Sequence, residues 1–328
     1  RADRGRAERS MEEMHVVIGA AGALGSAIVA FLASKGKSVR AVVRDLDRAR
    51  RVLPPSADIA IGDGSHAESV RLVCRNATVI YHCINVPFKD WDSVMPAVTD
   101  NILAGARESK ARLVFPGNVY GYGPLRATPA TEDHPLMANS KKGQLRNDVE
   151  RKLIDANLMA DVKVVIPRFP EFYGPNVKNW LMTPVFQAAL DGRTASWPGK
   201  LDVPHDLIYI DDAAAACCIL GSSEPCYGQV WHVPGAGPVT GKQFIGMAFE
   251  AAGTKARMRA ITRGSLRVKG VFGSEAREMI ELIYGFEQPM VLDGSKFAGA
   301  FPSFRYTTHE HAIRQTGNWY GQHLDARR

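Results

Sequence analysis

Cysteine is scarce in this sequence, and no two cysteines are spaced as Cys-x-x-Cys. The five are Cys74, Cys83, Cys217, Cys218 and Cys226. A disulfide framework or a structural zinc site would need more cysteines, or closely paired ones. We therefore expect reduced thiols in a cytoplasmic protein with no metal site.

Long hydrophobic runs are also missing. The longest mainly apolar stretch, Val16 to Ala33, contains three glycines and a serine, which makes a membrane helix the less favoured interpretation. The N-terminus lacks an apolar core before any cleavage site, so we expect no signal peptide. Residues 1–13 alternate arginine with acidic residues and lack large aliphatic side chains. They are predicted to form a mobile tail, with Met11 as a candidate natural start.

Acidic residues are absent between Ala251 and Ser274, although the chain as a whole carries a net charge of +7. Part of this charge lies in that stretch, on Lys255, Arg257, Arg259, Arg263, Arg267 and Lys269. A solvated helical face is the favoured interpretation, and steering of an anionic cofactor or substrate is the alternative. No stacking aromatic residues interleave with these charges, which argues against a nucleic-acid partner.

The most informative stretch present is Met-His-Val-Val-Ile-Gly-Ala-Ala-Gly-Ala-Leu-Gly, residues 14–25. A short apolar run leads directly into Gly19, Gly22 and Gly25, and an apolar helical pattern follows. Such a strand, tight turn and helix can bring backbone N–H groups and a helix N-terminus to a diphosphate. Gly19 suits a positive φ, Gly22 allows close approach of the pyrophosphate, and Gly25 allows tight helix packing.

Strand and helix patterns alternate through the first half of the chain. The predicted strands are 15–18, 38–43, 59–62, 77–83, 111–115, 162–166 and 229–233, and the predicted helices between them are 23–34, 65–75, 92–109 and 139–157. Several strands carry consecutive β-branched residues, which is typical of strands buried on both faces of a parallel sheet. The pattern predicts an α/β fold with a doubly wound, Rossmann-type parallel sheet.

After residue 168 the pattern loosens. Helices are predicted at 178–191, 211–220, 241–252 and 274–284. We expect residues 14–168 to form an NAD(P)-binding domain, to which strand 229–233 returns, and residues 169–328 to form mainly a smaller substrate-binding lobe. A cleft between such lobes is a usual substrate site.

The end of the second predicted strand indicates which dinucleotide is bound. Arg44 stands there, and arginine suits the 2′-phosphate of NADP, whereas an acid suits the 2′-hydroxyl of NAD. Asp45 follows at once, so NAD stays possible while NADP is favoured. Asp63 can accept a hydrogen bond from the adenine amine or cap the following helix. Asn85 follows strand four and is expected near the nicotinamide ribose.

Five motifs in matching order resemble the extended short-chain dehydrogenase/reductase family, which includes NAD-dependent epimerases and dehydratases. They are Gly19-x-x-Gly22-x-x-Gly25, Asp63, Val119-Tyr120-Gly121, Phe172-Tyr173-Gly174-Pro175 and Ile208-Tyr209-Ile210-Asp211-Asp212. The resemblance implies a cofactor site that includes Gly19, Ala21, Gly22, Ala23, Leu24, Gly25, Arg44, Asp63, Asn85 and Lys142. It also implies a homodimer through helices 92–109 and 139–157, with Leu145, Val149, Leu153 and Ile154 either at the interface or on the sheet.

The sequence departs from the family at the catalytic positions. Pro116 takes the place of the usual Ser/Thr, and no Tyr-x-x-x-Lys occurs between Tyr122 and Arg168. Lys142 and Arg146 stand where the tyrosine and lysine are expected, and with Glu150 they share one helical face. A similar helix occurs in isoflavone reductase-like enzymes, so by resemblance Lys142 could give a hydrogen bond or proton to a substrate oxygen. A solvated, ion-paired Lys142 is the alternative.

Asn118 and Tyr120 are further candidates for hydrogen bonds to a substrate, although the family's tyrosine at Tyr120 is usually structural. The predicted substrate-binding residues are Pro87, Trp91, Tyr173, Trp180 and His205. His205 stands where sugar-nucleotide enzymes of the family often carry arginine, which argues against a nucleotide-sugar substrate.

Three functions follow from this sequence. The leading one is an NADP(H)-dependent oxidoreductase acting on a small, fairly apolar carbonyl, imine or activated alkene. The first alternative is a redox-neutral epimerase, dehydratase or lyase that uses transient oxidation. The second is a non-catalytic regulator that senses NADP.

Overall fold

The computed structural model describes residues 13–265 and 280–324 of the 328-residue chain. The predicted mobile tail lies outside these residues except for Glu13. Most of the predicted helix 274–284 and the basic residues Arg267 and Lys269 also lie outside them.

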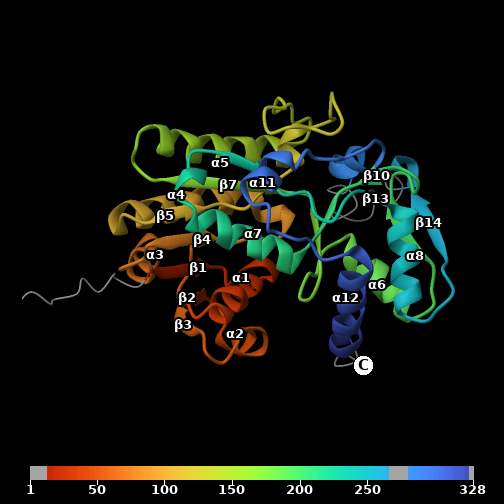
Figure 1. Ribbon diagram of the computed structural model, residues 1–328, viewed down its shortest axis with the longest axis horizontal. Coiled ribbons are helices and arrows are strands. Elements are labelled where there is room, and N and C mark those ends of the chain that lie inside the picture. The colour runs from red at the N-terminus through yellow and green to blue at the C-terminus, as the bar shows by residue number, and fades with distance from the viewer. Residues whose placement is uncertain (1–12, 266–279, 325–328) are drawn as a thin grey trace, which may run out of the picture.

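A parallel sheet forms the centre of the fold (Figure 1). Its strands are β1 (Met14–Ile18), β2 (Ser38–Val43), β3 (Asp58–Ile61), β4 (Val79–His82), β5 (Arg112–Val114), β7 (Val164–Phe169) and β12 (Val230–His232), with short β6 (Gly117–Asn118) beside β7. The spatial order is β12-β7-β5-β4-β1-β2-β3, so the chain runs outward in both directions from β1. The predicted α/β, doubly wound parallel sheet is confirmed.

Consecutive apolar residues in the strands reflect burial on both faces of this sheet. Every residue of β7 and β4 is buried, and so are four of the five in β1. Alternate side chains of β1 enter different cores: Val17 packs in one hydrophobic cluster, while Val16 and Ile18 pack in another. Such strands lack the alternation of a half-exposed sheet because neither face meets water.

Helices cover both faces of the sheet. On one face lie α1 (Ala23–Ser34) and α7 (Ile210–Ser222), and on the other lie α3 (Ala67–Val73), α4 (Trp91–Ser109) and α5 (Lys141–Leu158). The side chain of Ser140 starts α5 by accepting a hydrogen bond from the Gly143 N–H at 3.1 Å. A short helix that the pattern did not predict, α2 (Leu46–Val52), follows β2.

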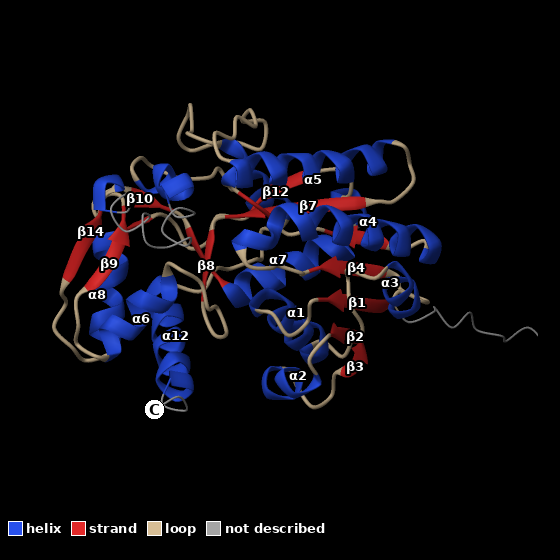
Figure 2. Cartoon of the chain, turned by 180° about the vertical axis from the view of Figure 1, so that it is seen from behind, coloured by secondary structure: helices blue, strands red, loops and turns tan. Residues whose placement is uncertain are grey.

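The C-terminal part has a separate aromatic-rich core that includes Phe186, Trp197, Phe244 and Tyr320. Around it pack α6 (Met182–Leu190), α8 (Gly241–Ala251) and α12 (His309–Leu324), which Figure 2 shows grouped away from strands β1–β3. Three short strand pairs complete this part: β8 (Glu171–Tyr173) with β11 (Leu207–Tyr209), β9 (Ala195–Pro198) with β14 (Met258–Ile261), and β10 (Pro204–His205) with β13 (Val239–Thr240). Helix α11 (Ser295–Ala300) lies near β12, and the one-turn 3-10 helices are η1 (Phe88–Asp90), η2 (Tyr120–Tyr122), η3 (Glu224–Cys226) and η4 (Ile283–Phe286).

Two of the four residues considered for a dimer face serve the core of the monomer. Val149 and Leu153 are buried in the cluster beneath α4 and α5, whereas Ile154 is exposed. In the part of the chain that the structure describes, we find no helix of the length and apolar character needed to cross a membrane.

Candidate active site

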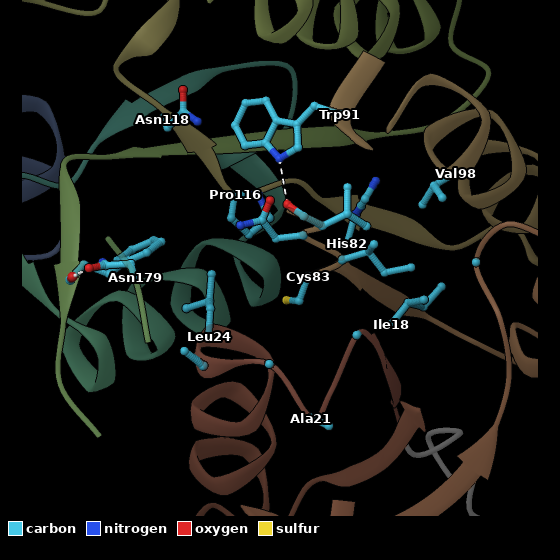
Figure 3. A pocket seen from close by; sticks show the side chains of 18 of the residues that line it. Ile18, Ala21, Leu24, His82, Cys83, Trp91, Val98, Pro116, Asn118 and Asn179 are labelled. Carbon is cyan, nitrogen blue, oxygen red and sulfur yellow. Dashed lines mark hydrogen bonds between the residues drawn. The ribbon is translucent and has the colours of Figure 1, made fainter. Parts of the chain in front are cut away.

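A cavity of about 610 Å³ opens at the carboxyl ends of β1, β2 and β4 (Figure 3). Strand β1 lies between β2 and β4, at the point where the strand order reverses. The crevice outside such a reversal is the usual ligand site of open α/β sheets. Residues 176–180 of the C-terminal part close its far wall.

The glycine turn forms the floor of this cavity. Gly19 has a φ of +90°, and a Cβ there would lie 2.8 Å from backbone atoms of Cys83. A Cβ on Gly25 would lie 2.4 Å from the Gly19 carbonyl oxygen, so Gly25 serves helix packing and does not line the cavity. Gly22 starts α1 without a side-chain cap, and no acidic residue occupies the first turn. The predicted residues that line the floor are Gly19, Ala21, Gly22, Ala23 and Leu24.

This floor fits a diphosphate chemically. Among the described residues, no side chain caps the first N–H groups of α1, and the helix dipole favours an anion at that end. Asn176 holds the facing wall against the turn, because its Nδ2 donates to Ser26 Oγ at 3.2 Å.

At the end of β2, the charged residues divide into two roles. Asp45 caps α2, with its Oδ1 accepting the Arg48 N–H at 2.9 Å. The exposed side chains of Arg44 and Arg48 border the cavity. They form no ion pair with any residue in the described ranges.

Asp63 borders the same end of the cavity. Its Oδ1 accepts hydrogen bonds from the Ser65 N–H at 2.9 Å and the Ser65 hydroxyl at 2.8 Å. These bonds, together with the nearby charge of Arg44, hold the pKa of this carboxyl below its usual range. His66, not Asp63, occupies the cap position of α3.

The other end of the cavity is aromatic. The ring of Phe88 packs 5.0 Å from that of Trp91, and Tyr120 lies 6.3 Å from Trp91, between ring centroids. The Trp91 ring nitrogen donates to the Val86 carbonyl at 2.9 Å, as Figure 3 shows. Asn85 lines the cavity nearby, whereas Pro87 does not.

Arg146 reaches this aromatic end from α5. Its Nη2 donates to the Pro116 carbonyl at 2.9 Å, and its guanidinium lies 4.8 Å from the Phe115 ring centre. Its buried Nε has no hydrogen-bond partner within residues 13–265 and 280–324. Asn118 also lines the cavity, with Oδ1 accepting the Tyr120 N–H at 3.1 Å.

Lys142 lies outside the cavity lining, although it shares the buried face of α5 with Arg146 and Glu150. Its ammonium is 5.3 Å from the centre of the Phe88 ring and 3.9 Å from Glu281 Oε2. The residue is only 7% exposed. The alternative interpretation, a solvated lysine paired with an acid one helical turn away, is therefore wrong: Lys142 is buried, and its ion pair is with Glu281.

Tyr120 brings a partner that the sequence analysis missed. Its hydroxyl donates to Glu171 Oε1 at 2.5 Å, and both side chains border the cavity. Burial, and then the charge of Glu171, raise the pKa of Tyr120 well above its usual value. Burial also raises the pKa of Glu171, while the bond from Tyr120 acts in the opposite direction.

Besides Pro87, two further predicted substrate residues do not line the main cavity. Tyr173 is fully buried and bonds His309 Nδ1 at 2.8 Å, which makes it part of the C-terminal core. His205 is also buried and borders a smaller second cavity. Trp180 does line the main cavity and packs edge-on against Phe286.

Arg48, Phe88, Glu171 and Asn176 are the main lining residues that the sequence analysis did not single out. Arg48 was detectable, because it follows Arg44 by four residues in the same basic segment. Glu171 and Asn176 flank the Phe172-Tyr173-Gly174-Pro175 motif, and this proximity was the available signal.

The sequence and the fold are similar to those of known proteins. The model of the NAD dependent epimerase/dehydratase family matches residues 15–226. The comparison with curated proteins found no significant match.

Solved structures of similar fold cover nearly the whole chain. The dTDP-glucose 4,6-dehydratase of Bacillus anthracis str. Ames, in complex with NAD, has a TM-score of 0.79 at 17% identity and covers 95% of this chain and 98% of its own. WbmH of Bordetella bronchiseptica, in complex with NAD+, has a TM-score of 0.76 at 17% identity, with coverages of 95% and 99%. The UDP-glucose 4-epimerase of Thermus thermophilus, in complex with NAD, has a TM-score of 0.75 at 19% identity, with coverages of 94% and 99%.

The family match spans well over half of the sequence and includes the glycine turn, Asp63 and the Val119-Tyr120-Gly121 segment at the cavity. The resemblance to extended short-chain dehydrogenases/reductases is confirmed, and the chain belongs to the NAD-dependent epimerase/dehydratase family.

Proposed function

We propose that this chain is an NADP(H)-dependent oxidoreductase that acts on a small, fairly apolar carbonyl, imine or activated alkene. The observation that carries the proposal is one continuous cavity with two different ends. One end has an uncapped helix N-terminus and two arginines that lack an ion pair in the described ranges, and the other has aromatic walls.

The preference for NADP rests on the residues after β2. Asp45 was the feature that left NAD open, and its carboxylate is committed to the first turn of α2. Arg44 and Arg48 instead present guanidinium groups to the cavity. Guanidinium groups bind phosphate through charge-assisted hydrogen bonds, which suits a 2′-phosphate.

The preference for an apolar substrate rests on the opposite end. Phe88, Trp91, Phe172 and Trp180 all line the cavity. Aromatic walls favour apolar ligands and exclude water around them. The polar groups among them are few, chiefly Asn118, Arg146 and the Tyr120–Glu171 pair.

In this proposal the cofactor, when bound, supplies or accepts a hydride at its nicotinamide ring. The N–H groups of α1 bind its diphosphate, and Asp63 accepts a hydrogen bond from its adenosine half. The guanidinium of Arg146 places a positive charge beside the oxygen of a bound substrate, which stabilises developing negative charge there. The rings of Phe88 and Trp91 keep water away from the reacting carbon.

Lys142 takes the helix position of the family's catalytic tyrosine, but its geometry supports a different role. Its ammonium lies on the Phe88 ring, and Phe88 lines the cavity. We propose that Lys142 holds this ring in place. Lys142→Ala then raises KM up to about tenfold, as expected for loss of one cation–π contact, with a smaller change in kcat. A fall in kcat of about a hundredfold, with unchanged NADPH affinity, would instead make Lys142 the proton donor.

The test of the proposed function is a set of substrates followed at the NADPH absorbance. Purified protein is titrated with NADPH and NADH by fluorescence and then assayed with small ketones, imines and enones. We expect tighter binding of NADPH and stoichiometric oxidation with at least one class. Tighter binding of NADH, or binding without turnover on any class, contradicts the proposal, and the latter outcome favours the NADP-sensing regulator.

A redox-neutral reaction is the second candidate, because the family and the solved relatives carry the names epimerase and dehydratase. Its signature is a tightly retained dinucleotide that is recycled without a net absorbance change. Product analysis by mass spectrometry, with and without added NADPH, separates the two candidates, since only the oxidoreductase needs stoichiometric NADPH.

A further inference from the structure

Two cavities share one wall. The main cavity and a second one of about 30 Å³ are both bordered by Val119, Tyr120, Pro170 and Glu171. The second cavity has room for about one water molecule. The Tyr120–Glu171 pair therefore lies between the substrate end of the site and this small second cavity.

Glu171 is an unusual carboxylate for such a position. Its Oε1 accepts the Tyr120 hydroxyl, whereas no residue in the described ranges bonds its Oε2 or forms an ion pair with it. A partly buried carboxylate without a cation readily takes up a proton. Among the described residues, the other carboxyl groups that line the main cavity are Asp45 and Asp63, which lie at the opposite, adenosine end.

Resting on the proposed function, we propose that Glu171 is the catalytic acid–base residue of this site and that Tyr120 is its positioning residue. Tyr120 holds Oε1, which leaves Oε2 for the substrate. This assignment fills the role left by the missing Tyr-x-x-x-Lys pair with residues from two different parts of the chain.

The proton and electron balance is complete for a carbonyl substrate. The carbonyl carbon gains a hydride from NADPH and forms a C–H bond, while the C=O π pair moves to the oxygen. That oxygen takes the proton of the Glu171 carboxyl and becomes a hydroxyl. NADPH is oxidised to NADP+, and Glu171 is left as a carboxylate that regains a proton from water. Oxidation of an alcohol is the reverse.

The titratable and charged groups around the Tyr120–Glu171 pair influence the pKa of Glu171. The Tyr284 hydroxyl bonds the Tyr120 carbonyl at 3.4 Å, and Arg146 lies on the main-cavity side. His205 and Asp206 border the second cavity, where His205 Nε2 and Asp206 Oδ1 are buried without partners among the described residues. Burial lowers the pKa of His205 to about 4 and raises that of Asp206 to about 7.

The first experiment separates proton transfer from a structural role. The amide oxygen in Glu171→Gln can still accept the Tyr120 hydroxyl, but the amide cannot act as an acid that gives a proton and takes it back. We expect kcat to fall about a hundredfold or more, with NADPH affinity within about twofold of wild type. Glu132→Gln is the matched control, because Glu132 accepts the His232 N–H at 2.8 Å but lines neither cavity. It should leave kcat unchanged.

The second experiment tests the role of Tyr120 by the pH profile. The Tyr120 hydrogen bond lowers the pKa of Glu171, so Tyr120→Phe raises it. Reduction needs protonated Glu171, and its rate therefore falls as the pH rises through that pKa. In Tyr120→Phe this fall moves to higher pH. The pH profile of Asp206→Asn is measured as well. If the fall in rate moves along the pH axis only in Asp206→Asn, the assignment to Glu171 is overturned.

A third readout does not need turnover. Infrared difference spectra across a pH titration should show the carbonyl band of a protonated, buried glutamic acid. The band disappears in Glu171→Gln, shifts in Tyr120→Phe and persists in Glu132→Gln. If the wild type turns over a substrate and Glu171→Gln retains more than half of its kcat, this inference is overturned and the proposed function stays intact. A wild type that fails to turn over any substrate overturns the proposed function and this assignment together.

Discussion

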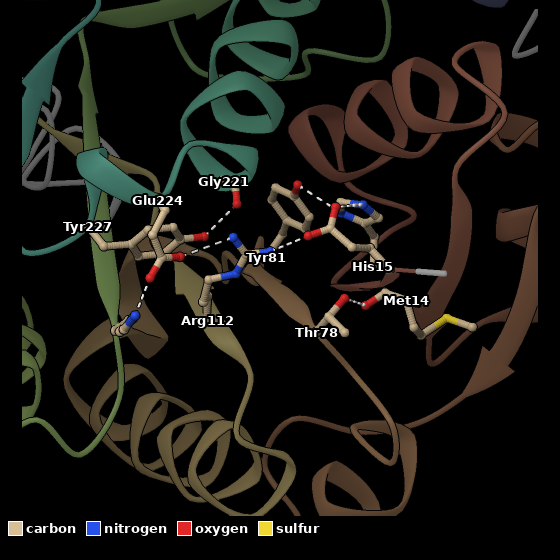
Figure 4. A network of polar contacts seen from close by, with 10 residues as sticks. Met14, His15, Thr78, Tyr81, Arg112, Gly221, Glu224 and Tyr227 are labelled. Atoms are coloured by element: carbon tan, nitrogen blue, oxygen red, sulfur yellow. Dashed lines mark hydrogen bonds and ion pairs between the residues drawn. The ribbon is translucent and has the colours of Figure 1, made fainter. Parts of the chain in front are cut away.

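At the amino ends of the strands, Arg112 bonds Glu13 at 2.5 Å and approaches Glu224 at 3.5 Å, while Tyr227 donates to the Gly221 carbonyl at 2.6 Å (Figure 4). At the carboxyl ends, Arg44 and Arg48 have no ion pair within the described ranges, and no side chain there caps the first N–H groups of α1. The two ends come from the same strands and carry similar residue types. Polar groups satisfied within the fold contribute to stability, whereas polar groups left free at a cavity are available to a ligand.

This contrast predicts that changes at the carboxyl ends affect binding and that changes at the amino ends affect stability. The largest expected effect is at the glycine turn. The added Cβ in Gly25→Ala meets the Gly19 carbonyl at 2.4 Å and the Ala20 Cα at 2.9 Å, so the turn must shift. We expect NADPH affinity to fall by about a hundredfold or more, measured by fluorescence titration.

The matched control for this change is Gly246→Ala in α8, where an added Cβ meets nothing within 4 Å among the described residues. It should retain NADPH binding and change stability by less than about 1 kcal/mol. Equal affinities in the two variants would contradict the role of the turn.

A smaller effect is expected at the end of β2. Loss of one charge-assisted bond in Arg44→Ala should weaken NADPH binding about tenfold to a hundredfold and leave NADH binding nearly unchanged. Arg50→Ala, an exposed arginine on α2 that does not line the cavity, provides the comparison. An equal loss for both dinucleotides would argue against recognition of a 2′-phosphate.

The smallest effect on the site is expected from His15 at the amino end. Burial lowers its pKa to about 4, below the unfolded value of about 6.5. The folded state therefore binds fewer protons, and His15 lowers the stability as the pH falls from about 6.5 towards 4. Between pH 7 and pH 5 this costs about 2 kcal/mol.

Urea unfolding at the two pH values tests this expectation. Between pH 7 and pH 5, the free energy of unfolding of His15→Gln should fall by about 2 kcal/mol less than that of the wild type. Its NADPH affinity should be unchanged. His311→Gln, on the exposed side of α12, should behave as wild type. A change in NADPH affinity in His15→Gln would contradict the expectation that changes at the amino ends of the strands affect stability and not binding.

The sequence predicted the sheet well because most of its strands contain runs of consecutive apolar residues, and each predicted strand lies within three residues of the observed one. Helix α12 was missed because its buried residues, His309, Ala312, Ile313, Thr316 and Tyr320, include only one large aliphatic side chain, so the helical apolar pattern is weak. Short pairs such as β8 with β11 join distant segments, and no local pattern indicates them.

The site was predictable at its cofactor end and less so at its substrate end. The glycine turn and Arg44 are local features, whose geometry follows from neighbouring residues. Lys142 and Arg146 were correctly expected on one helical face. Helical periodicity does not indicate which groups a side chain contacts, and the Lys142 ammonium contacts the Phe88 ring. Glu171 and Tyr120 are 51 residues apart in the sequence, and no local pattern indicates that they meet.

The bond from Asn176 to Ser26 has a mechanical consequence. It fastens the wall formed by residues 176–180 to the first turn of α1, so these two sides of the cavity move together. Any opening of the cavity between residues 176–180 and α1 has to break this bond.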